Sequence, residues 1–412
     1  LYKEALENYR KLAEKNPDAY LPYVAMSCNN LAILYKKTNR YAEAEALYKE
    51  ALEIRRTLAA KNPDAYLPYV AMSCNSQAGL YQNTNRYAEA EALHKEALEI
   101  RRTLAAKNPD AYLPDVAMSC NNLAVLYKDT NRYAEAEALS KEVLKIYRAL
   151  ASKTPDAYLP DVATSCNNLA ILYQNTNRYA DAEALYKEAL ENYRTLAEKN
   201  PDAYLPDVAM SCNNLAILYK NTNRYAEAEA LYKEALENYR KLAEKNPDVY
   251  LPNVATSCNN LANLYQNTNR YAEAEALYKE ALEIRRTLAA KHPDAYLPDV
   301  ARSCNNLALL YQNTNRYAEA EALYKEALDN YRKLAEKNPD VYLPDVATSC
   351  YNLANLYQNT NRYAEAEALY KESLEIRRKL AEKNPDVYLP YVATSCYNLA
   401  NLYQNTNRYA EA

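Results

Sequence analysis

The sequence predicts an all-α fold of the solenoid type, in which short helical units stack in one direction. The first observation is a repeat: the phrase Asn-Pro-Asp-Ala-Tyr-Leu-Pro starts at Asn16 and returns every 46 residues with little change. The second is that each unit carries two apolar stripes at helical spacing, and the third is that helix-ending residues separate them. A fixed period in this range is typical of solenoids. The equivalents of Pro17 are Pro63, Pro109, Pro155, Pro201, Pro247, Pro293, Pro339 and Pro385.

Pro22 marks the predicted start of the first helix of a unit, because the fixed backbone angle and missing N–H of proline suit a first turn. Apolar side chains then recur from Val24 to Tyr35 at spacings of three and four. The helix is predicted to end before Asn39, which recurs ahead of Arg-Tyr in every unit. Asparagine tolerates the left-handed conformation that ends a helix and turns the chain.

A second helix is predicted from Tyr41 to about Lys61, with an apolar stripe on one side and glutamates and lysines on the other. Charged pairs at i,i+4 support such an exposed face. Asn62 and Pro63 end this helix, because the residue before a proline avoids helical geometry. Residues 64–67 are then predicted to form a loop, and the second helix is predicted to be distinctly longer than the first.

We expect residues 1–412 to form a single solenoid from the interior of a longer array, because the units at both ends are cut within helices. Residues 1–15 match the second helix of a truncated unit, and residues 390–412 match a truncated final pair. No polar capping unit is visible. The predicted helix pairs between them are 22–61, 68–107, 114–153, 160–199, 206–245, 252–291, 298–337 and 344–383.

Composition narrows the function classes. The formal net charge is -4 with both signs spread evenly, so the basic stripe that nucleic-acid binding needs is missing. No apolar run approaches about 18 residues, so we predict no membrane insertion. The nine cysteines occur once per unit at the position of Cys28. Equivalent positions in stacked units lie too far apart for disulfides, so these cysteines are expected to be small buried packing residues.

The sequence offers no candidate for catalysis. His94 and His292 are the only histidines, and they lie more than four units apart, so they cannot share a metal or a proton relay. The single glycine excludes a phosphate-cradling loop, and the carboxylates are spread over solvated helix faces. We therefore predict no catalytic residue, no metal site and no cofactor, in a protein that is not an enzyme.

The apolar ladder of one unit resembles the tetratricopeptide repeat, which has a large residue, Leu-Gly, Tyr, Ala, an aromatic residue and Ala at the same intervals. HEAT repeats share the period but lack this ladder. The stretch NNLAILYKKTNRYAEAEALYKEALEI is most similar to the long-helix repeats of kinesin light chains. The resemblance implies a right-handed superhelix of about nine helix-turn-helix repeats. The residues that carry it in the first unit are Cys28, Leu31, Ala32, Tyr35, Ala44, Tyr48 and Ala51.

In the resembling family the first helices line a concave groove, which implies a peptide-binding surface here. Matching the motif places Met26, Asn29 and Ile33 on that surface in the first unit. The recurring amides either bind an extended peptide backbone or hydrogen-bond from one first helix to the next. We expect Asn29-type positions to bind and Asn30-type positions to join helices. The predicted groove residues are Asn29, Ile33, Asn75, Asn121, Asn167, Ile171, Asn213, Ile217, Asn259, Asn263, Asn305, Tyr351, Asn355, Tyr397 and Asn401.

The second and third units depart from the pattern. Gln77 and Gly79 replace a leucine and an isoleucine of the first helix, and His94 and then Ser140 replace the packing tyrosine of the Tyr48 position. A buried glutamine and a mid-helix glycine both weaken a helix pair. The changes are either drift that a long array tolerates or the mark of a local hinge or pocket.

Two functions from different classes fit the sequence. The first is a non-enzymatic scaffold that takes a protein or an extended peptide along the groove, and for it we expect a cytoplasmic location. The second is a structural protein, extracellular in location, that forms filaments by end-to-end self-association. Nearly identical units favour the second, because a heterologous contact that does not close makes a fibre.

Overall fold

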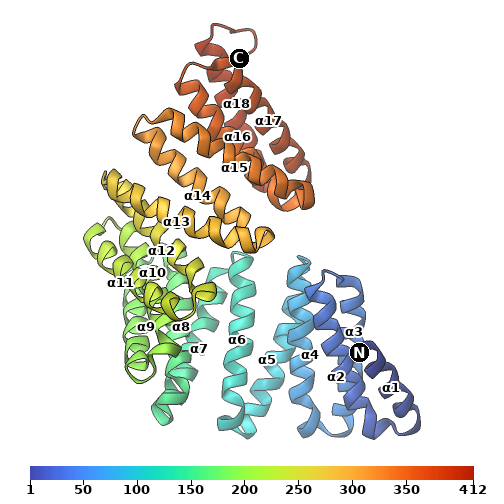
Figure 1. Cartoon of the computed structure of the whole chain (residues 1–412). Coiled ribbons are helices and arrows are strands. Elements are labelled where there is room, and N and C mark those ends of the chain that lie inside the picture. Colours follow the sequence, from blue (N-terminus) through green and yellow to red (C-terminus); the bar gives the residue numbers. More distant parts are fainter. The chain divides into compact units, whose positions relative to one another are not determined.

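The structure is a computed structural model that describes residues 1–412 and contains eighteen α-helices and no strands (Figure 1). The first helices of the repeats are α2 (Pro17–Lys37), α4 (Pro63–Asn83), α6 (Pro109–Asp129), α8 (Pro155–Asn175), α10 (Pro201–Asn221), α12 (Pro247–Asn267), α14 (Pro293–Asn313), α16 (Pro339–Asn359) and α18 (Pro385–Asn405). The second helices are α1 (Tyr2–Lys15), α3 (Tyr41–Lys61), α5 (Tyr87–Lys107), α7 (Tyr133–Lys153), α9 (Tyr179–Lys199), α11 (Tyr225–Lys245), α13 (Tyr271–Lys291), α15 (Tyr317–Lys337) and α17 (Tyr363–Lys383). The predicted all-α fold of repeated helix pairs is confirmed.

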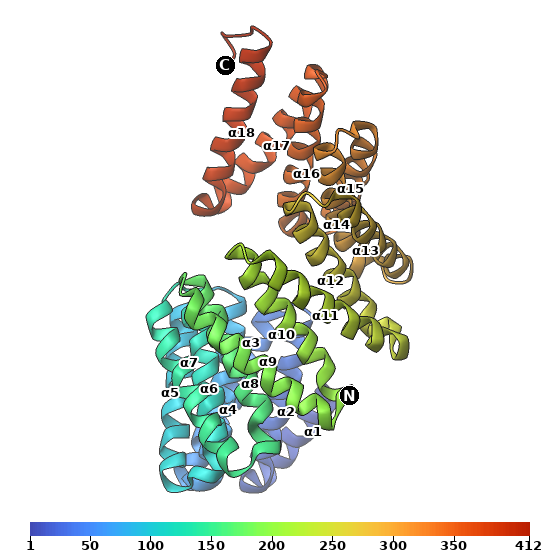
Figure 2. The same ribbon diagram turned by 90° about the vertical axis from the view of Figure 1, so that its left-hand side faces the viewer.

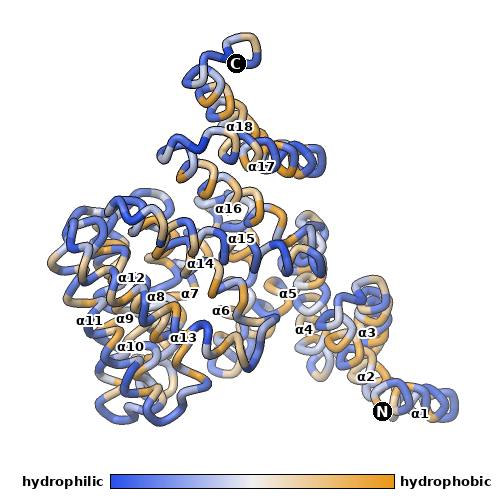
Figure 3. The backbone as a smooth tube through the Cα atoms, turned by 45° about the horizontal axis from the view of Figure 1, so that its top comes forward, coloured by the Kyte–Doolittle hydropathy of each residue, from blue (hydrophilic) through white to orange (hydrophobic).

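The helices belong to two compact units, unit 1 (Leu1–Asn200) and unit 2 (Pro201–Ala412). Within each unit every helix packs against the helix before it and the helix after it. Figure 1 shows this succession clearly for α1 to α4 in unit 1, and Figure 2 shows it for α16 to α18 in unit 2. Apolar and polar residues alternate along each helix, as the colouring of Figure 3 shows, so one side of a helix is buried against its neighbours.

The turn between the two helices of a repeat is built around an asparagine in the left-handed conformation. Asn39 has φ 58°. The N–H of Arg40 donates to the carbonyl oxygen of Tyr35 at 2.9 Å, and the N–H of Asn39 donates to the carbonyl oxygen of Lys36 at 3.2 Å. This is the Schellman pattern that ends helices. The hydroxyl of Tyr41 donates to the Asn39 side chain at 2.8 Å and holds the turn from outside. All nine equivalent asparagines have positive φ, which confirms the predicted role.

The predicted start of the first helix was wrong. Helix α2 begins at Pro17, with Pro22 inside it, and the equivalent residues 64–67 are helical in α4. Asn62 ends α3 and caps α4, because its side chain accepts from the N–H of Ala65. Proline at the first helical position and this cap start the helix five residues early, while the second proline removes only one hydrogen bond near an exposed end.

The second helix is therefore not longer than the first. Both α2 and α3 contain 21 residues. The expectation that the excess over a repeat of about 34 residues lies in the second helix alone is corrected, since the turn ahead of Pro22 lengthens the first helix as well.

The core of each repeat consists of alanines, leucines, one cysteine and tyrosines. The cysteines are free, and eight of the nine are buried, as predicted. Burial raises the pKa of the Cys120 thiol to about 12, so this side chain stays protonated at neutral pH and behaves as a small apolar group.

A glutamate, a tyrosine and an arginine join consecutive repeats in a contact that we call the clasp. Glu91 of α5 accepts from the hydroxyl of Tyr127 in α6 at 3.0 Å and from Arg132 at 2.7 Å, and it also pairs with Lys95 at 2.7 Å. The Arg132 guanidinium lies 4.1 Å from the Tyr127 ring centre. Burial alone would raise the pKa of Glu91, but hydrogen bonds from Lys95, Arg132 and Tyr127 lower it to about 2.

The clasp recurs within both units. Its other copies are Glu45 with Tyr81 and Arg86, Glu137 with Tyr173 and Arg178, Glu229 with Tyr265 and Arg270, Glu275 with Tyr311 and Arg316, Glu321 with Tyr357 and Arg362, and Glu367 with Tyr403 and Arg408.

Replacing Asn131 by alanine should destabilise the chain by about 1–2 kcal/mol, because an alanine in the left-handed conformation is strained. Asn131 has φ 59° and accepts from the Tyr133 hydroxyl at 3.0 Å. Glycine at this position, which adopts positive φ freely, should cost less. Denaturant unfolding of both variants measures the difference. Equal losses for alanine and glycine would show that the side-chain contact, and not the backbone conformation, matters.

The clasp should make the free energy of unfolding depend on pH in the acidic range. Because the pKa of Glu91 is lowered to about 2, its contribution is complete above the unfolded-state value of about 4.3 and is lost as the pH falls toward the folded value. Glu91→Gln should therefore have its largest deficit in unfolding free energy near pH 6 and a smaller one near pH 2.5. Glu99→Gln, at an exposed residue of the same helix, is the control. A deficit that is constant with pH would contradict this account.

Candidate functional site

The exposed large apolar side chains of the interior repeats gather on the first helices. Tyr23, Met26 and Ile33 of α2 are all exposed. We call the surface formed by these three positions in each repeat the first-helix face. Other exposed apolar members are Tyr69, Met72, Met118, Val125, Ile171, Met210, Leu309 and Tyr391. A row of exposed apolar side chains on one side of a fold is typical of a binding surface.

Most Asn29-type residues do not lie open on this face. Asn29, Asn167 and Asn259 are buried. Of the half-buried ones, Asn75, Asn213 and Asn305 donate to the hydroxyl of a serine in the next first helix, at distances of 3.3–3.4 Å. The serine acceptors are Ser119, Ser257 and Ser349. This position therefore joins neighbouring helices, the role that was predicted for the Asn30 position. Asn121, half-buried like them, lines two cavities of this face.

The tyrosines that replace asparagine near the C-terminus differ from each other. Tyr351 is half-buried, with its ring centre 5.9 Å from that of Tyr370 and 5.1 Å from the Arg377 guanidinium. Its hydroxyl also accepts from the amide of Asn398 at 2.9 Å. Tyr397 is 68% exposed and is the more open contact position of the two.

The Ile33 position differs between the units. In unit 1, Ile33 and Ile171 are exposed on the first-helix face. In unit 2, Asn263 and Asn355 instead accept from the hydroxyls of the buried Tyr278 and Tyr370, each at 2.5 Å. Ile217 and Asn401 are half-buried. At this position unit 1 is thus the more apolar, although Leu309 of unit 2 is exposed as well, while Asn263 and Asn355 serve internal tyrosines.

A cavity on the first-helix face lies between α2 and α4 and is also lined by residues of α3. It has a volume of about 520 Å³, and its walls include Tyr23, Met26, Tyr69 and Met72. Arg55 of α3 also lines it and is only 5% exposed. The guanidinium donates to the hydroxyl of Ser73 at 2.6 Å and to the carbonyl of Tyr69 at 3.2 Å. We call this cavity the Arg55 pocket.

Arg55 makes no ion pair. Burial lowers its pKa, yet an arginine side chain stays charged in a protein. Arg101, the equivalent residue in the next repeat, has the carboxylate of Asp115 at 3.7 Å, and Tyr69 occupies that aspartate position for Arg55. A buried cation without an anionic partner is unfavourable and attracts one. The first-helix face therefore offers an apolar cavity with positive charge at its base.

Arg377 of unit 2 has similar surroundings. It is buried between the rings of Tyr351 and Tyr391 and donates to Ser395. Our reading of the sequence missed both arginines. The signal is present, because the second helices carry either Arg or Tyr at this position, and only Arg55 and Arg377 combine arginine with a tyrosine 14 residues later.

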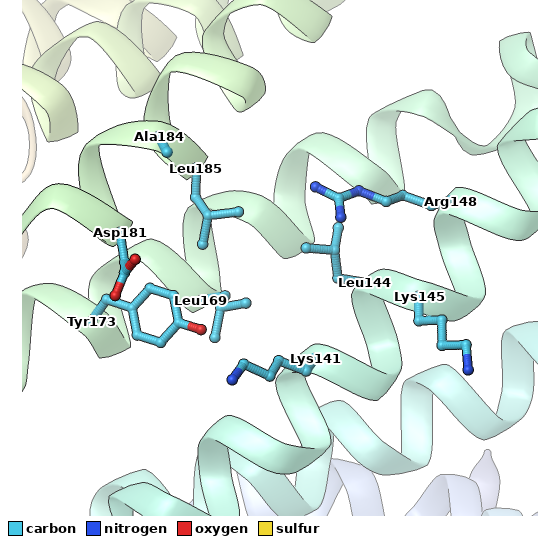
Figure 4. A pocket seen from close by; sticks show the side chains of 9 residues that line it. All are labelled: Lys141, Leu144, Lys145, Arg148, Leu169, Tyr173, Asp181, Ala184 and Leu185. Carbon is cyan, nitrogen blue, oxygen red and sulfur yellow. The ribbon is translucent and has the colours of Figure 1, made fainter. Parts of the chain in front are cut away.

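A second cavity, of about 490 Å³, lies between α7, α8 and α9 (Figure 4). Lys141 and Tyr173 extend toward each other beside Leu169, while Arg148 lies on the other side of Leu144. Two of its three cations are already paired, Lys141 with Glu137 and Arg148 with Glu188, each at 2.6 Å, and the third, Lys145, is exposed to solvent. The Arg55 pocket is consequently the better candidate for binding an anionic group.

The titratable groups of the chain do not gather in one place. No three His, Cys, Asp or Glu side chains gather in a way that could hold a metal ion. His94 is buried, which lowers its pKa to about 4, and its ring faces Asn75 and Gln82. None of the helices is both long and apolar enough to cross a membrane.

Solved structures with the same kind of fold include several repeat proteins. A signal transduction ATPase with numerous domains from Pyrococcus horikoshii, which has a tetratricopeptide repeat sensor, is 17% identical with a TM-score of 0.53, covering 89% of this chain and 54% of that one. The apo form of RapI is 16% identical with a TM-score of 0.50, covering 76% and 99%. A putative kinesin light chain from Podospora anserina with nearly identical repeats is 22% identical, with a TM-score of 0.43 and coverage of 55% and 98%.

No curated protein matches the sequence. The family described as tetratricopeptide repeat matches most of the chain. The matched residues are 24–64, 70–110, 116–156, 162–202, 208–248, 254–294, 305–379 and 392–412. With helix pairs at the same positions in the structure, the chain belongs to the tetratricopeptide-repeat family.

Proposed function

We propose that this chain is a non-enzymatic scaffold that holds an extended segment of a partner protein along the first-helix face. Membership of the tetratricopeptide-repeat family supports a protein-interaction role in general. The single observation that carries the finer proposal is the Arg55 pocket, where exposed apolar walls surround a buried arginine without an ion pair.

The pocket indicates the chemistry of the partner segment. Tyr23, Met26, Tyr69 and Met72 suit a large apolar side chain, and methionine adapts its shape to different guests. A carboxylate next to that side chain would supply the anion that Arg55 lacks. Charge-assisted hydrogen bonds between guanidinium and carboxylate are among the stronger polar contacts, because the arginine is already desolvated and held in place.

The remaining contact positions follow the exposure of the predicted groove residues. Ile33 and Ile171, both in unit 1, are exposed and are proposed to contact the partner directly. Asn29-type amides support the surface from beneath by joining first helices. The partner segment is thus proposed to contact apolar side chains and a buried charge more than the Asn29-type amides.

End-to-end self-association into filaments is the second candidate. It is favoured by the sameness of the repeats, since the clasp recurs with nearly the same distances in both units. Electron microscopy and sedimentation of the purified chain separate the two functions. Long fibres would favour the filament, and a monodisperse particle that binds peptides would favour the scaffold.

Selection of a displayed random peptide library on the full chain should enrich peptides in which an acidic residue neighbours a large apolar one. Arg55→Met should weaken the selected peptides by about 10- to 100-fold, corresponding to the loss of a hydrogen bond to a charged group of about 1.5–3 kcal/mol. Titration calorimetry measures the affinity.

Arg101→Met is the matched control, because Arg101 is equally buried but already has Asp115 beside it. Circular dichroism confirms that both variants fold. Selected peptides that bind Arg55→Met as tightly as the original chain, or a library that yields no binder, would overturn the proposal.

A further inference from the structure

One internal position of the third repeat lacks the side chain that the other repeats use to fill their centre. Where Ser140 stands, unit 2 has tyrosines whose rings are only 1–2% exposed. These buried tyrosines are Tyr232, Tyr278, Tyr324 and Tyr370. In unit 1 the same position holds Tyr48 and Tyr186, each 2% exposed.

The buried ring ends on an amide of the first helix. Tyr186 donates from its hydroxyl to the side-chain oxygen of Gln174 at 3.2 Å, and Tyr278 donates to that of Gln266 at 3.0 Å. A phenol therefore spans the space from the second helix to the last turn of the first helix, with its oxygen held at the far end.

The third repeat leaves that space open. A cavity of about 80 Å³ lies between α6, α7 and α8. Ser140 lines it together with Val125 and Lys128. These two residues occupy the positions of Asn263 and Gln266, which accept from the Tyr278 hydroxyl. Val125 and Ile171, at its rim, are 39% and 37% exposed, so the cavity lies at the first-helix face. Such a volume exceeds what one water needs, about 10–15 Å³.

The preceding repeat shows that a missing tyrosine need not leave a cavity. His94 replaces it there, is 2% exposed, and has its two ring nitrogens 2.7 Å from Asn75 Oδ1 and 3.2 Å from Gln82 Oε1. The imidazole fills the site with its own ring and contacts. Ser140 has no ring, and a cavity of about 80 Å³ remains beside it, which is part of the space that a ring would occupy.

The polar lining favours one kind of guest. In place of the glutamines that accept from the hydroxyls of Tyr186 and Tyr278, the third repeat has Lys128, whose ammonium only donates and lies 3.7 Å from the Asp129 carboxylate. Asn121 and Asn168 also line the cavity. A ring with a terminal oxygen would place an acceptor toward Lys128 and its apolar body against Val125 and Ile171, whereas a plain hydrocarbon ring would leave the ammonium without a new partner.

We infer that this cavity, the Ser140 pocket, accepts the p-hydroxyphenyl group of a tyrosine presented by the bound partner. The inference rests on the proposed function, because it names a side chain that the same first-helix face takes. The ring enters from the face between Val125 and Ile171, and its hydroxyl oxygen accepts from the Lys128 ammonium. The guest supplies an aromatic ring from outside. Every repeat of unit 2 with a complete second helix has its own buried tyrosine ring at this place.

The free probe p-cresol tests the pocket without any peptide. Titrated into the full chain, it should perturb the methyl NMR signals of Val125 and Ile171 in a saturable way. Ser140→Tyr, which supplies the ring covalently, should abolish this response and raise the melting temperature by a few degrees. Toluene, which has no oxygen, should bind at least fivefold more weakly than p-cresol. No saturable response to p-cresol, or equal affinity for toluene, would overturn the inference.

Tyr186→Ser is the matched control, because it should open the same space in the next repeat with Gln174 in place of Lys128. It is expected to bind p-cresol at a second site, and comparison with the original chain shows what the lysine adds. If this variant does not fold, Ser140→Tyr alone still decides the outcome.

A second arm uses peptides selected on the full chain. A tyrosine in such a peptide, replaced by alanine, should weaken binding about tenfold to the original chain and leave binding to Ser140→Tyr unchanged. An equal effect on both proteins would overturn the inference. A library without binders would overturn the proposed function while p-cresol binding persists, so the two failures are distinguishable.

Discussion

Burial of one apolar side of each helix against the next helix is the constraint on which the rest of this structure depends, because a single helix pair cannot bury its apolar side alone. Alanines set the closeness of the helices: Ala25, Ala44 and Ala51 are all completely buried. Where the helices leave a gap, one tyrosine per repeat fills it. The tyrosine is replaced twice, by His94, whose ring fills the gap, and by Ser140, which leaves the Ser140 pocket because an interior packed like an organic crystal has no spare atoms to fill the space.

Charged residues around the buried core of the repeats have two different roles. On the outside, pairs such as Arg56 with Glu96 join consecutive second helices at 2.6 Å, but exposed pairs of this kind contribute little stability. The clasp of Glu91 is stronger, because a ring and two cations meet one partly buried carboxylate. Arg55 is the opposite case, a buried cation without a carboxylate, and that deficit is the reason for proposing its pocket as a binding site.

The sequence predicted the repeat, the two helices, the turn at Asn39 and the buried cysteines, because periodicity and local backbone preferences determine these features. It failed at the first-helix start, where Pro22 was assigned a role that Pro17 performs. Capping by Asn62 favours the early start of the helix, whereas the second proline inside the helix opposes it. The sequence pattern alone does not show which effect is larger. The candidate site was predicted only in outline. Asn29-type residues lie on the correct helix, but a shift of one position around a helix turns a side chain by about 100°, from the open face toward the next helix.

The sequence by itself determined that this protein is a stack of helix pairs from the tetratricopeptide-repeat family, because every local signal repeats with the same period and agrees with the fold. Only the tertiary structure decided which repeats differ in the surroundings of their side chains. Arg55 and Arg101 are the same residue in the same helix position, and Tyr69 or Asp115, brought against them from the following helix, makes one a free charge and the other a paired one. Ser140 likewise reads as drift until α6 and α8 are seen to leave its space unfilled. Binding depends on what neighbours place beside a residue, and the neighbours come from other repeats.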